Sequence, residues 1–166
     1  MNTVKFSLTE SALKILTSVG VNPREYVSAY DGESSGLDLY NVGTKVKVHG
    51  RTKWSVYGEE PVVVPVGIKL LLPMGTVGLI RERGSIFGTG LSYRGGVIDP
   101  GFSGEVFVNL VNLGERDTQI PPGAKLPLQL IVVPCIHNFE LISDLEYMEN
   151  SRGFVRGERS LGSTNS

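Results

Sequence analysis

The chain has 166 residues, enough for one domain with a sizeable buried core. Its formal net charge of −1 gives no basic field, which excludes a general nucleic-acid binder, and its single cysteine excludes an intrachain disulfide or a cysteine-rich zinc site. No stretch approaches the roughly 18 apolar residues of a membrane span. We therefore expect a protein of the reducing cytoplasm, or of the host cytoplasm if its source is viral, with no membrane or nucleic-acid partner.

The first predicted element is a helix over residues 9–19. Thr9 or Ser7 is placed to cap its N-terminus, and Gly20 would end it. After this helix, short β-rich runs alternate with turn signals, a spacing that indicates a sandwich or barrel. The predicted strands cover residues 37–40, 45–49, 61–64, 67–72, 76–82, 104–112, 125–133 and 138–143.

The most informative segment is Gly-Gly-Val-Ile-Asp-Pro-Gly-Phe-Ser-Gly-Glu at residues 95–105. It places Asp99 at the end of an apolar β run, where Pro100 and Gly101 favour a type II turn and the chain folds back as a hairpin. A carboxylate with an ordinary pKa near 4 is ionised at neutral pH, so Asp99 is a candidate base for activating water. An Asp that merely caps a turn is the alternative.

Together with four other segments, residues 95–105 resemble the five ordered motifs of the trimeric dUTPases. The other segments are Glu-Ser-Ser-Gly-Leu-Asp-Leu-Tyr at 33–40, Arg-Gly-Ser-Ile-Phe-Gly-Thr-Gly-Leu at 83–91, Gly-Ala-Lys-Leu-Pro-Leu-Gln-Leu-Ile-Val-Val-Pro at 123–134 and Arg-Gly-Glu-Arg-Ser-Leu-Gly-Ser-Thr at 156–164. The resemblance implies an all-β fold, a dUTPase-like barrel or jelly roll, here with one short N-terminal helix. It also implies a β domain over residues 1–150 and a flexible C-terminal arm over 151–166.

The activity implied by this resemblance is hydrolysis of dUTP to dUMP and pyrophosphate, which limits uracil incorporation into DNA and supplies dUMP for dTTP synthesis. Asp99 would activate the water that attacks the α-phosphorus. The resemblance assigns Asp38 as a second catalytic residue, near the catalytic water. Mg²⁺ would be held mainly by the substrate phosphates and, through water, by Asp38. The family forms homotrimers whose active sites are shared between subunits, so we expect the same assembly here.

The resemblance also assigns substrate contacts residue by residue. The phosphates would be bound by Arg83, Gly84, Ser85, Gln129, Arg156, Ser163 and Thr164. The deoxyuridine would be bound by Gly96, Val97, Ile98, Asp99, Phe102 and Leu161. Taken alone, Gln129 could equally bond a neighbouring backbone group.

Three departures from the family pattern are visible. Gly84 stands where the family usually has Ser, and Leu161 stands where an aromatic ring usually stacks on the base. The step from Gly123 to Gln129 is one residue longer than usual. Because Pro127 has no N–H to donate, we expect it at a strand edge or in a bulge, and a bulge would absorb the extra residue.

Two other functions compete with this interpretation. The Asp-Pro-Gly segment also resembles dCTP deaminases and bifunctional deaminase–diphosphatases, but Asn109 holds the place of their catalytic Glu, and an amide cannot shuttle protons as a carboxylate does. A non-catalytic nucleotide-binding regulator on the same scaffold is the second. Measuring the release of pyrophosphate and of ammonia from dUTP and from dCTP would distinguish these three functions.

Overall fold

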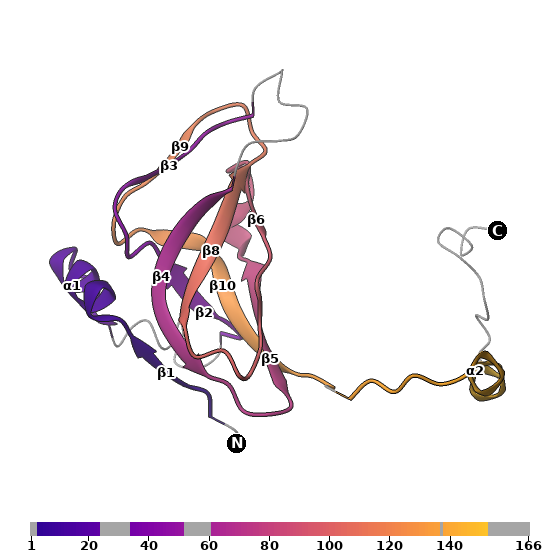
Figure 1. Cartoon of the computed structure of the whole chain (residues 1–166). Coiled ribbons are helices and arrows are strands. Elements are labelled where there is room, and N and C mark those ends of the chain that lie inside the picture. The colour runs from indigo at the N-terminus through magenta and orange to yellow at the C-terminus, as the bar shows by residue number, and fades with distance from the viewer. Residues whose placement is uncertain (1–2, 24–33, 52–60, 137, 153–166) are drawn as a thin grey trace. The chain divides into compact units, whose positions relative to one another are not determined.

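A computed structural model of the chain describes residues 3–23, 34–51, 61–136 and 138–152 (Figure 1). Strands dominate this part, joined by short turns. The strands are β1 (Lys5–Leu8), β2 (Leu37–Tyr40), β3 (Val46–Val48), β4 (Val62–Leu71), β5 (Thr76–Glu82), β6 (Leu91–Arg94), β7 (Val97–Ile98), β8 (Glu105–Asn112), β9 (Thr118–Ile120) and β10 (Lys125–Pro134). The helices are α1 (Glu10–Ser18), α2 (Asp144–Ser151) and the 3₁₀ turn η3 (Gly84–Ile86).

Most strands belong to two packed sheets. One has the order β1-β4-β8-β6 and the other β2-β10-β5-β7, while β3 and β9 form a separate two-stranded ribbon. Figure 1 shows β4 beside β8, with β10 and β2 in the layer behind them. Side chains from both sheets meet in one apolar core. The predicted all-β sandwich or barrel is therefore confirmed.

The alternation of side chains along the strands decides which residues face outward. In β8, Val106, Val108 and Leu110 are buried, whereas Phe107 and Asn109 are exposed. This period of two is what a strand with one face on the core produces. The outward face of β8 is thereby left free for a site.

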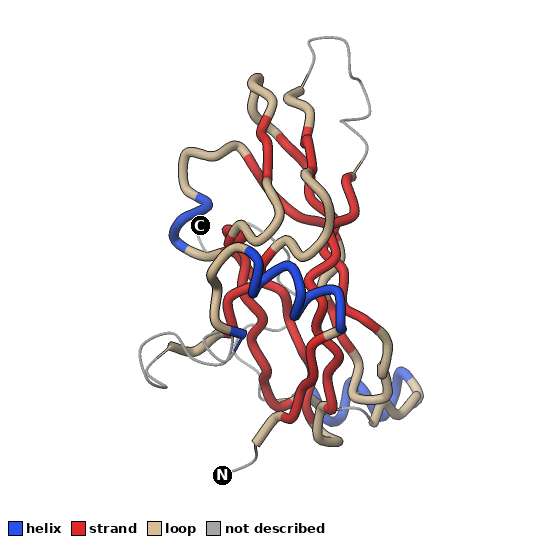
Figure 2. The backbone as a smooth tube through the Cα atoms, turned by 90° about the vertical axis from the view of Figure 1, so that its left-hand side faces the viewer, coloured by secondary structure: helices blue, strands red, loops and turns tan. Residues whose placement is uncertain are grey.

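The predicted N-terminal helix is confirmed as α1. The Thr9 hydroxyl accepts a hydrogen bond from the Ala12 N–H at 3.3 Å and caps the helix. Ala12 and Leu16 are fully buried, and α1 packs on β4. Figure 2 shows α1 lying against the strands.

Several predicted elements need correction. The segments 61–64 and 67–72 are one continuous strand, β4, and β1, β6 and β9 were not predicted. The apolar β run expected before Asp99 is β7. Residues 138–143 form no strand, and no strand among the described residues pairs with them. Instead Ser143 caps α2, a helix that was missed, by accepting from the Glu146 N–H at 3.3 Å.

The chain divides into one compact unit over residues 1–136 and a second over 137–166. All the strands belong to the first unit. The division at residue 150 expected from the sequence stays a prediction. Among the helices that the structure describes, none is long and apolar enough to cross a bilayer.

Candidate active site

Asp99 directly follows β7 and begins a tight turn. The Phe102 N–H donates to the Asp99 carbonyl at 3.0 Å, which closes this turn. On the other side, the Ile80 N–H donates to the Gly96 carbonyl at 2.8 Å and anchors β7 to β5. The backbone of Asp99 is therefore fixed by hydrogen bonds on both sides, and its exposed carboxylate extends from a rigid backbone.

The turn differs from the prediction in two respects. Gly101 is not among the described glycines with positive φ, so the turn is not of type II. The two strands beside it do not form a hairpin either, because β7 pairs with β5 whereas β8 pairs with β4 and β6. The turn instead carries the chain from one sheet to the other.

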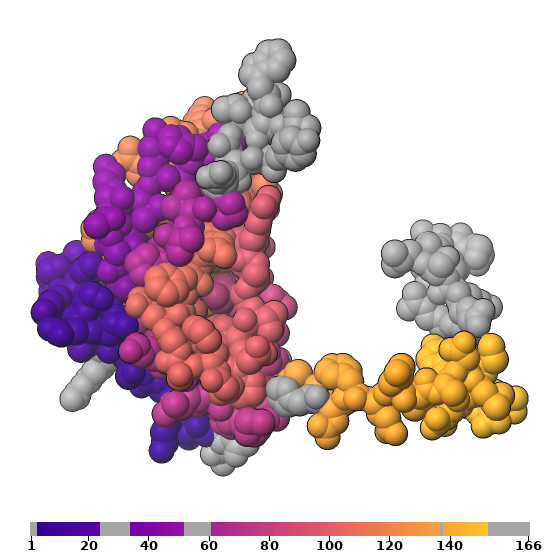
Figure 3. Space-filling view, in the orientation of Figure 1, coloured from indigo at the N-terminus to yellow at the C-terminus, as the bar shows by residue number. Residues whose placement is uncertain are grey.

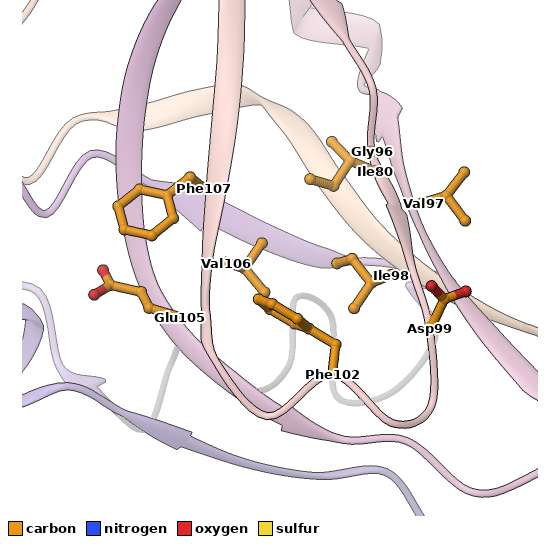
Figure 4. Close-up of a pocket in the computed structure, with 9 residues that line it drawn as sticks. All are labelled: Ile80, Gly96, Val97, Ile98, Asp99, Phe102, Glu105, Val106 and Phe107. Atoms are coloured by element: carbon orange, nitrogen blue, oxygen red, sulfur yellow. The ribbon is translucent and has the colours of Figure 1, made fainter.

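A pocket of about 220 Å³ lies at this crossing (Figure 4). Figure 4 shows the Phe102 ring beside Ile98 and Val106, with Asp99 and Glu105 on opposite sides of it. The described residues that line the pocket are Ile80, Gly96, Val97, Ile98, Asp99, Phe102, Glu105, Val106 and Phe107. The volume is below the usual range for whole drug-sized ligands, so it suits one part of a nucleotide rather than a complete triphosphate. Every predicted deoxyuridine residue except Leu161, which lies outside the described residues, lines this pocket.

A second group of predicted residues surrounds Asp38 on β2. The Arg83 Nε lies 2.7 Å from Asp38 Oδ1, and the Lys125 Nζ lies 3.0 Å from Oδ2. The Asp38 side chain is only 9% exposed, so the two cations compensate a nearly buried carboxylate. Two cations around one anion leave an excess positive charge beside η3, where Gly84 and Ser85 are exposed.

Gln129 stands opposite Asp38 in the pairing of β10 with β2. Its Nε2 donates to the Glu82 carbonyl at 3.1 Å, so its side chain bonds a backbone group of the neighbouring strand. The β10–β2 register shifts between Lys125 and Gln129, which confirms the predicted bulge. The Pro127 carbonyl within this bulge accepts from the Arg83 N–H at 3.0 Å and fixes the start of η3.

Lys125 is a site residue that the sequence interpretation missed. Its hydrogen bond to Asp38 raises the pKa of the Lys125 amine above its ordinary value against the opposing effect of burial, and its Nζ lies 5.4 Å from the centre of the Tyr40 ring. With Ser85 and Pro127, it also lines a second pocket of about 420 Å³. A lysine at the start of an apolar strand, within the segment 123–134 that resembles a family motif, was the available signal.

In the part of the chain that the structure describes, the two groups do not share a pocket. Among the described residues, neither Asp38 nor Arg83, Ser85 or Gln129 lines the pocket that holds Asp99. The predicted arm residues Arg156, Leu161, Ser163 and Thr164 lie outside the described residues. One chain therefore presents a nucleoside-sized pocket and a cationic group as separate surfaces.

The donor atoms limit how these residues could hold a metal. In the described part of the chain, no group of three or more His, Cys, Asp or Glu side chains is placed to bind a metal ion. Each oxygen of Asp38 already has a cationic partner. This donor set fits a hydrated Mg²⁺ contacted through water, because Mg²⁺ keeps several waters and oxygen ligands, rather than direct chelation by the protein.

Comparison with known proteins agrees with this geometry. The family model for dUTPase matches residues 31–164. The deoxyuridine 5'-triphosphate nucleotidohydrolase of Corynebacterium glutamicum is 33% identical, covering 72% of this chain and 78% of the relative. That of Orientia tsutsugamushi strain Ikeda is 29% identical, covering 79% of this chain and 82% of the relative.

Solved structures show the same fold. A point mutant of the Staphylococcus bacteriophage 80alpha dUTPase with dUpNHpp superposes with a TM-score of 0.69 at 22% identity, covering 99% of both chains. A point mutant of the dUTPase from phage phi11 of S. aureus, which coordinates a structural Mg(II) ion, gives a TM-score of 0.62 at 22% identity and covers 86% of this chain and 96% of its own. The five motifs, the jelly-roll barrel and the family match together show that the chain belongs to the dUTPase family, the dUTP diphosphatases.

Proposed function

We propose that Asp99 is the general base of dUTP hydrolysis in this protein. Its carboxylate would take a proton from a water that attacks the α-phosphorus, so that dUMP and pyrophosphate are released. The observation that carries this proposal is the fixed turn, which holds an exposed carboxylate beside an aromatic-lined pocket. A base needs this rigidity because reacting atoms must be held at close distance.

Phe102 and its neighbours would bind the deoxyuridine. The ring forms part of the pocket wall next to Ile98, and its 44% exposure leaves a face for a sugar or base. An aromatic ring packed against the sugar leaves no room for a ribose 2′-hydroxyl. Backbone groups of Gly96, Val97 and Ile98 that are not bonded to β5 would contact the uracil edge.

The group around Asp38 would bind the phosphates. Arg83 supplies a guanidinium that matches phosphate geometry, and Ser85 with the Gly84 backbone supplies neutral donors. Gln129 would exchange its bond to the Glu82 carbonyl for a phosphate oxygen. Arg156, Ser163 and Thr164 would add contacts from the arm.

Mg²⁺ would be held chiefly by the phosphates, with Asp38 contacting its hydration shell. The ion would supply charge neutralisation to the triphosphate. The chain's own contribution is to orient Asp38 through Arg83 and Lys125. The phi11 dUTPase, with its structural Mg(II) ion, supports this choice of metal.

A homotrimer with shared active sites would bring the two groups together. The separation of the Asp99 pocket from the Asp38 group within one chain supports this assembly. So does the exposure of large apolar side chains of the strand unit, including Val63 and Leu71 of β4, which a neighbouring copy would cover. In the cytoplasm, such an enzyme would limit uracil incorporation into DNA and supply dUMP for dTTP synthesis.

A two-substrate assay tests this function. Purified protein with Mg²⁺ is incubated with dUTP or dCTP at equal concentration, and pyrophosphate and ammonia are measured. We expect pyrophosphate from dUTP and no ammonia from either substrate. Ammonia from dCTP would indicate a deaminase, although Asn109 replaces the required Glu; nucleotide binding without turnover would indicate a regulator.

A further inference from the structure

A bulge in β4 leaves one glycine outside the sheet ladder. The β4–β8 register shifts between Pro65 and Lys69, and Gly67 lies in this interval with a φ of +68°. Its carbonyl accepts from the Thr9 N–H at 2.8 Å, and its N–H donates to Glu105 Oε1 at 3.2 Å. The two polar groups of Gly67 therefore join the start of α1 to the start of β8.

The packing around Gly67 is too close for any side chain. A Cβ there would lie 2.3 Å from the Ala12 Cβ and 2.9 Å from the Val42 Cγ2. Since Ala12 is fully buried in α1, the helix rests directly on the bulge. Figure 3 shows the indigo N-terminal residues packed against the barrel. Ala12 of α1 and the Thr9 N–H at its cap therefore contact Gly67 directly.

Glu105, which accepts the Gly67 N–H, connects this bulge to the Asp99 pocket. Glu105 is half-buried and lines that pocket itself. The preceding Gly104 packs against Phe102 so closely that a Cβ would lie 2.8 Å from the ring Cζ. Phe102 in turn donates the N–H that closes the Asp99 turn.

We infer that Glu105 is a positioning residue that couples α1 to the Asp99 pocket through Gly67. The connection runs from the Thr9 N–H to the Gly67 peptide, then to the Glu105 carboxylate and the turn closed by Phe102. Loss of a link leaves a polar group of Gly67 without its partner and lets the turn shift. The predicted change in KM for dUTP rests on the proposed function, whereas the structural coupling between α1 and the Asp99 turn does not.

Substitutions at Thr9 test the first link. Thr9 has a φ of −67° and follows strand β1, so proline fits the backbone and removes the N–H that bonds Gly67. Thr9→Ala is the matched control, because it removes the same capping hydroxyl but keeps that N–H. We expect hydrogen exchange of the Phe102 amide, measured on the nucleotide-free protein, to be roughly three- to tenfold faster in Thr9→Pro than in Thr9→Ala.

Substitutions at Glu105 test the second link. Glu105→Ala removes the acceptor for the Gly67 N–H, while Glu105→Gln keeps an acceptor oxygen without the charge. We expect Glu105→Ala to speed Phe102 exchange and to raise KM for dUTP roughly three- to tenfold with kcat nearly unchanged. Glu105→Gln should restore both values. In the Glu105→Ala background, Phe102 exchange should be about as fast with Thr9→Pro as with Thr9→Ala. The Gly67–Glu105 hydrogen bond is already lost there, so loss of the Thr9 N–H has no further effect on the turn.

The outcomes distinguish the coupling from general destabilisation and from the proposed function. If Thr9→Pro and Thr9→Ala give equal Phe102 exchange, or if exchange rises uniformly over the chain in step with Tm, the coupling is wrong. Failure of Glu105→Gln to rescue would overturn the hydrogen-bond role. If Phe102 exchange differs between the Thr9 variants as expected but the wild-type protein does not turn over dUTP, the proposed function is refuted and the coupling is not.

Discussion

Asp99 provides the sharpest test at the residue scale. Asp99→Asn keeps the shape of the side chain but removes the proton acceptor, so hydrolysis should fall by about 10²- to 10⁴-fold. Affinity for dUTP should stay within about tenfold, since the pocket is unchanged. Steady-state kinetics and calorimetric titration measure the two quantities. Near-normal turnover would remove Asp99 from its assigned role.

Phe102 should set the preference for deoxyribose. With the ring removed in Phe102→Ala, the pocket gains room for a 2′-hydroxyl, and the ratio of kcat/KM for dUTP to that for UTP should narrow by at least about tenfold. Phe107→Ala is the control, because Phe107 lines the same pocket from the exposed face of β8. An unchanged ratio in Phe102→Ala would contradict the assignment.

Lys125 should act through Asp38. In Lys125→Met, Asp38 keeps only Arg83, which is then less free to bind phosphate. KM for dUTP should rise roughly two- to fivefold, the scale of a half-exposed ion pair, and Lys125→Arg should restore it. Lys14→Met removes the same charge at an exposed helical pair and serves as the control. Equal KM values for Lys125→Met and Lys14→Met would leave Lys125 without this role.

At the scale of elements, one carboxylate, Asp117, bonds Lys47 of β3 from the residue before β9. The hydrogen bond from Lys47, followed by that from the Gly50 N–H, lowers the pKa of Asp117 from 3.8 to about 2. A carboxyl whose pKa is lower in the folded chain stabilises the fold above pH 4, and this stabilisation is lost as the pH falls towards 2. The Asp117 carboxylate therefore contributes more to the stability of the fold at neutral pH than in acid.

Urea unfolding of the wild type and of Asp117→Asn checks this dependence. The stability difference between them should be present at pH 6 and should shrink between pH 4 and pH 2, where Asp117 becomes protonated. Asparagine keeps an oxygen for the Gly50 N–H, so the comparison isolates the charge. A difference that is constant over this range would show that the charge is not responsible.

At the scale of the whole molecule, the proposed trimer makes a complementation experiment possible. Truncation after Asn150 removes Arg156 and the other predicted arm contacts, so nucleotide should bind weakly and turn over slowly. The barrel lies within residues 1–136 and should keep its fold and assembly. Light scattering and dUTP kinetics measure both consequences.

Mixing the truncated chain with Asp99→Asn should restore partial activity after subunit exchange. Some sites would then combine an intact Asp99 from one chain with an intact arm from another. Each parent alone, carried through the same exchange, is the control. A monomeric wild type, or mixed samples no more active than the parents, would argue against shared sites.

The sequence by itself determined the local features of the molecule. Period-two alternation predicted β8 to within one residue, and β2 and β5 have the predicted bounds. The bulge before Gln129 followed from Pro127 and the extra residue, because proline cannot donate to a ladder. The predicted helix is α1, and the Ser143–Glu146 capping signal of α2 was present but missed.

Only the tertiary structure decided which segments pair and which charges meet. The turn after Asp99 joins two sheets, because β7 pairs with β5 in one sheet whereas β8 pairs with β4 and β6 in the other. Lys125 reaches Asp38 across 87 positions, and Gly67 links α1 to Glu105 through a bulge that no local pattern reveals. Propensity and periodicity act between near neighbours in sequence, whereas these contacts depend on strand order and register, which the packing of the whole core fixes.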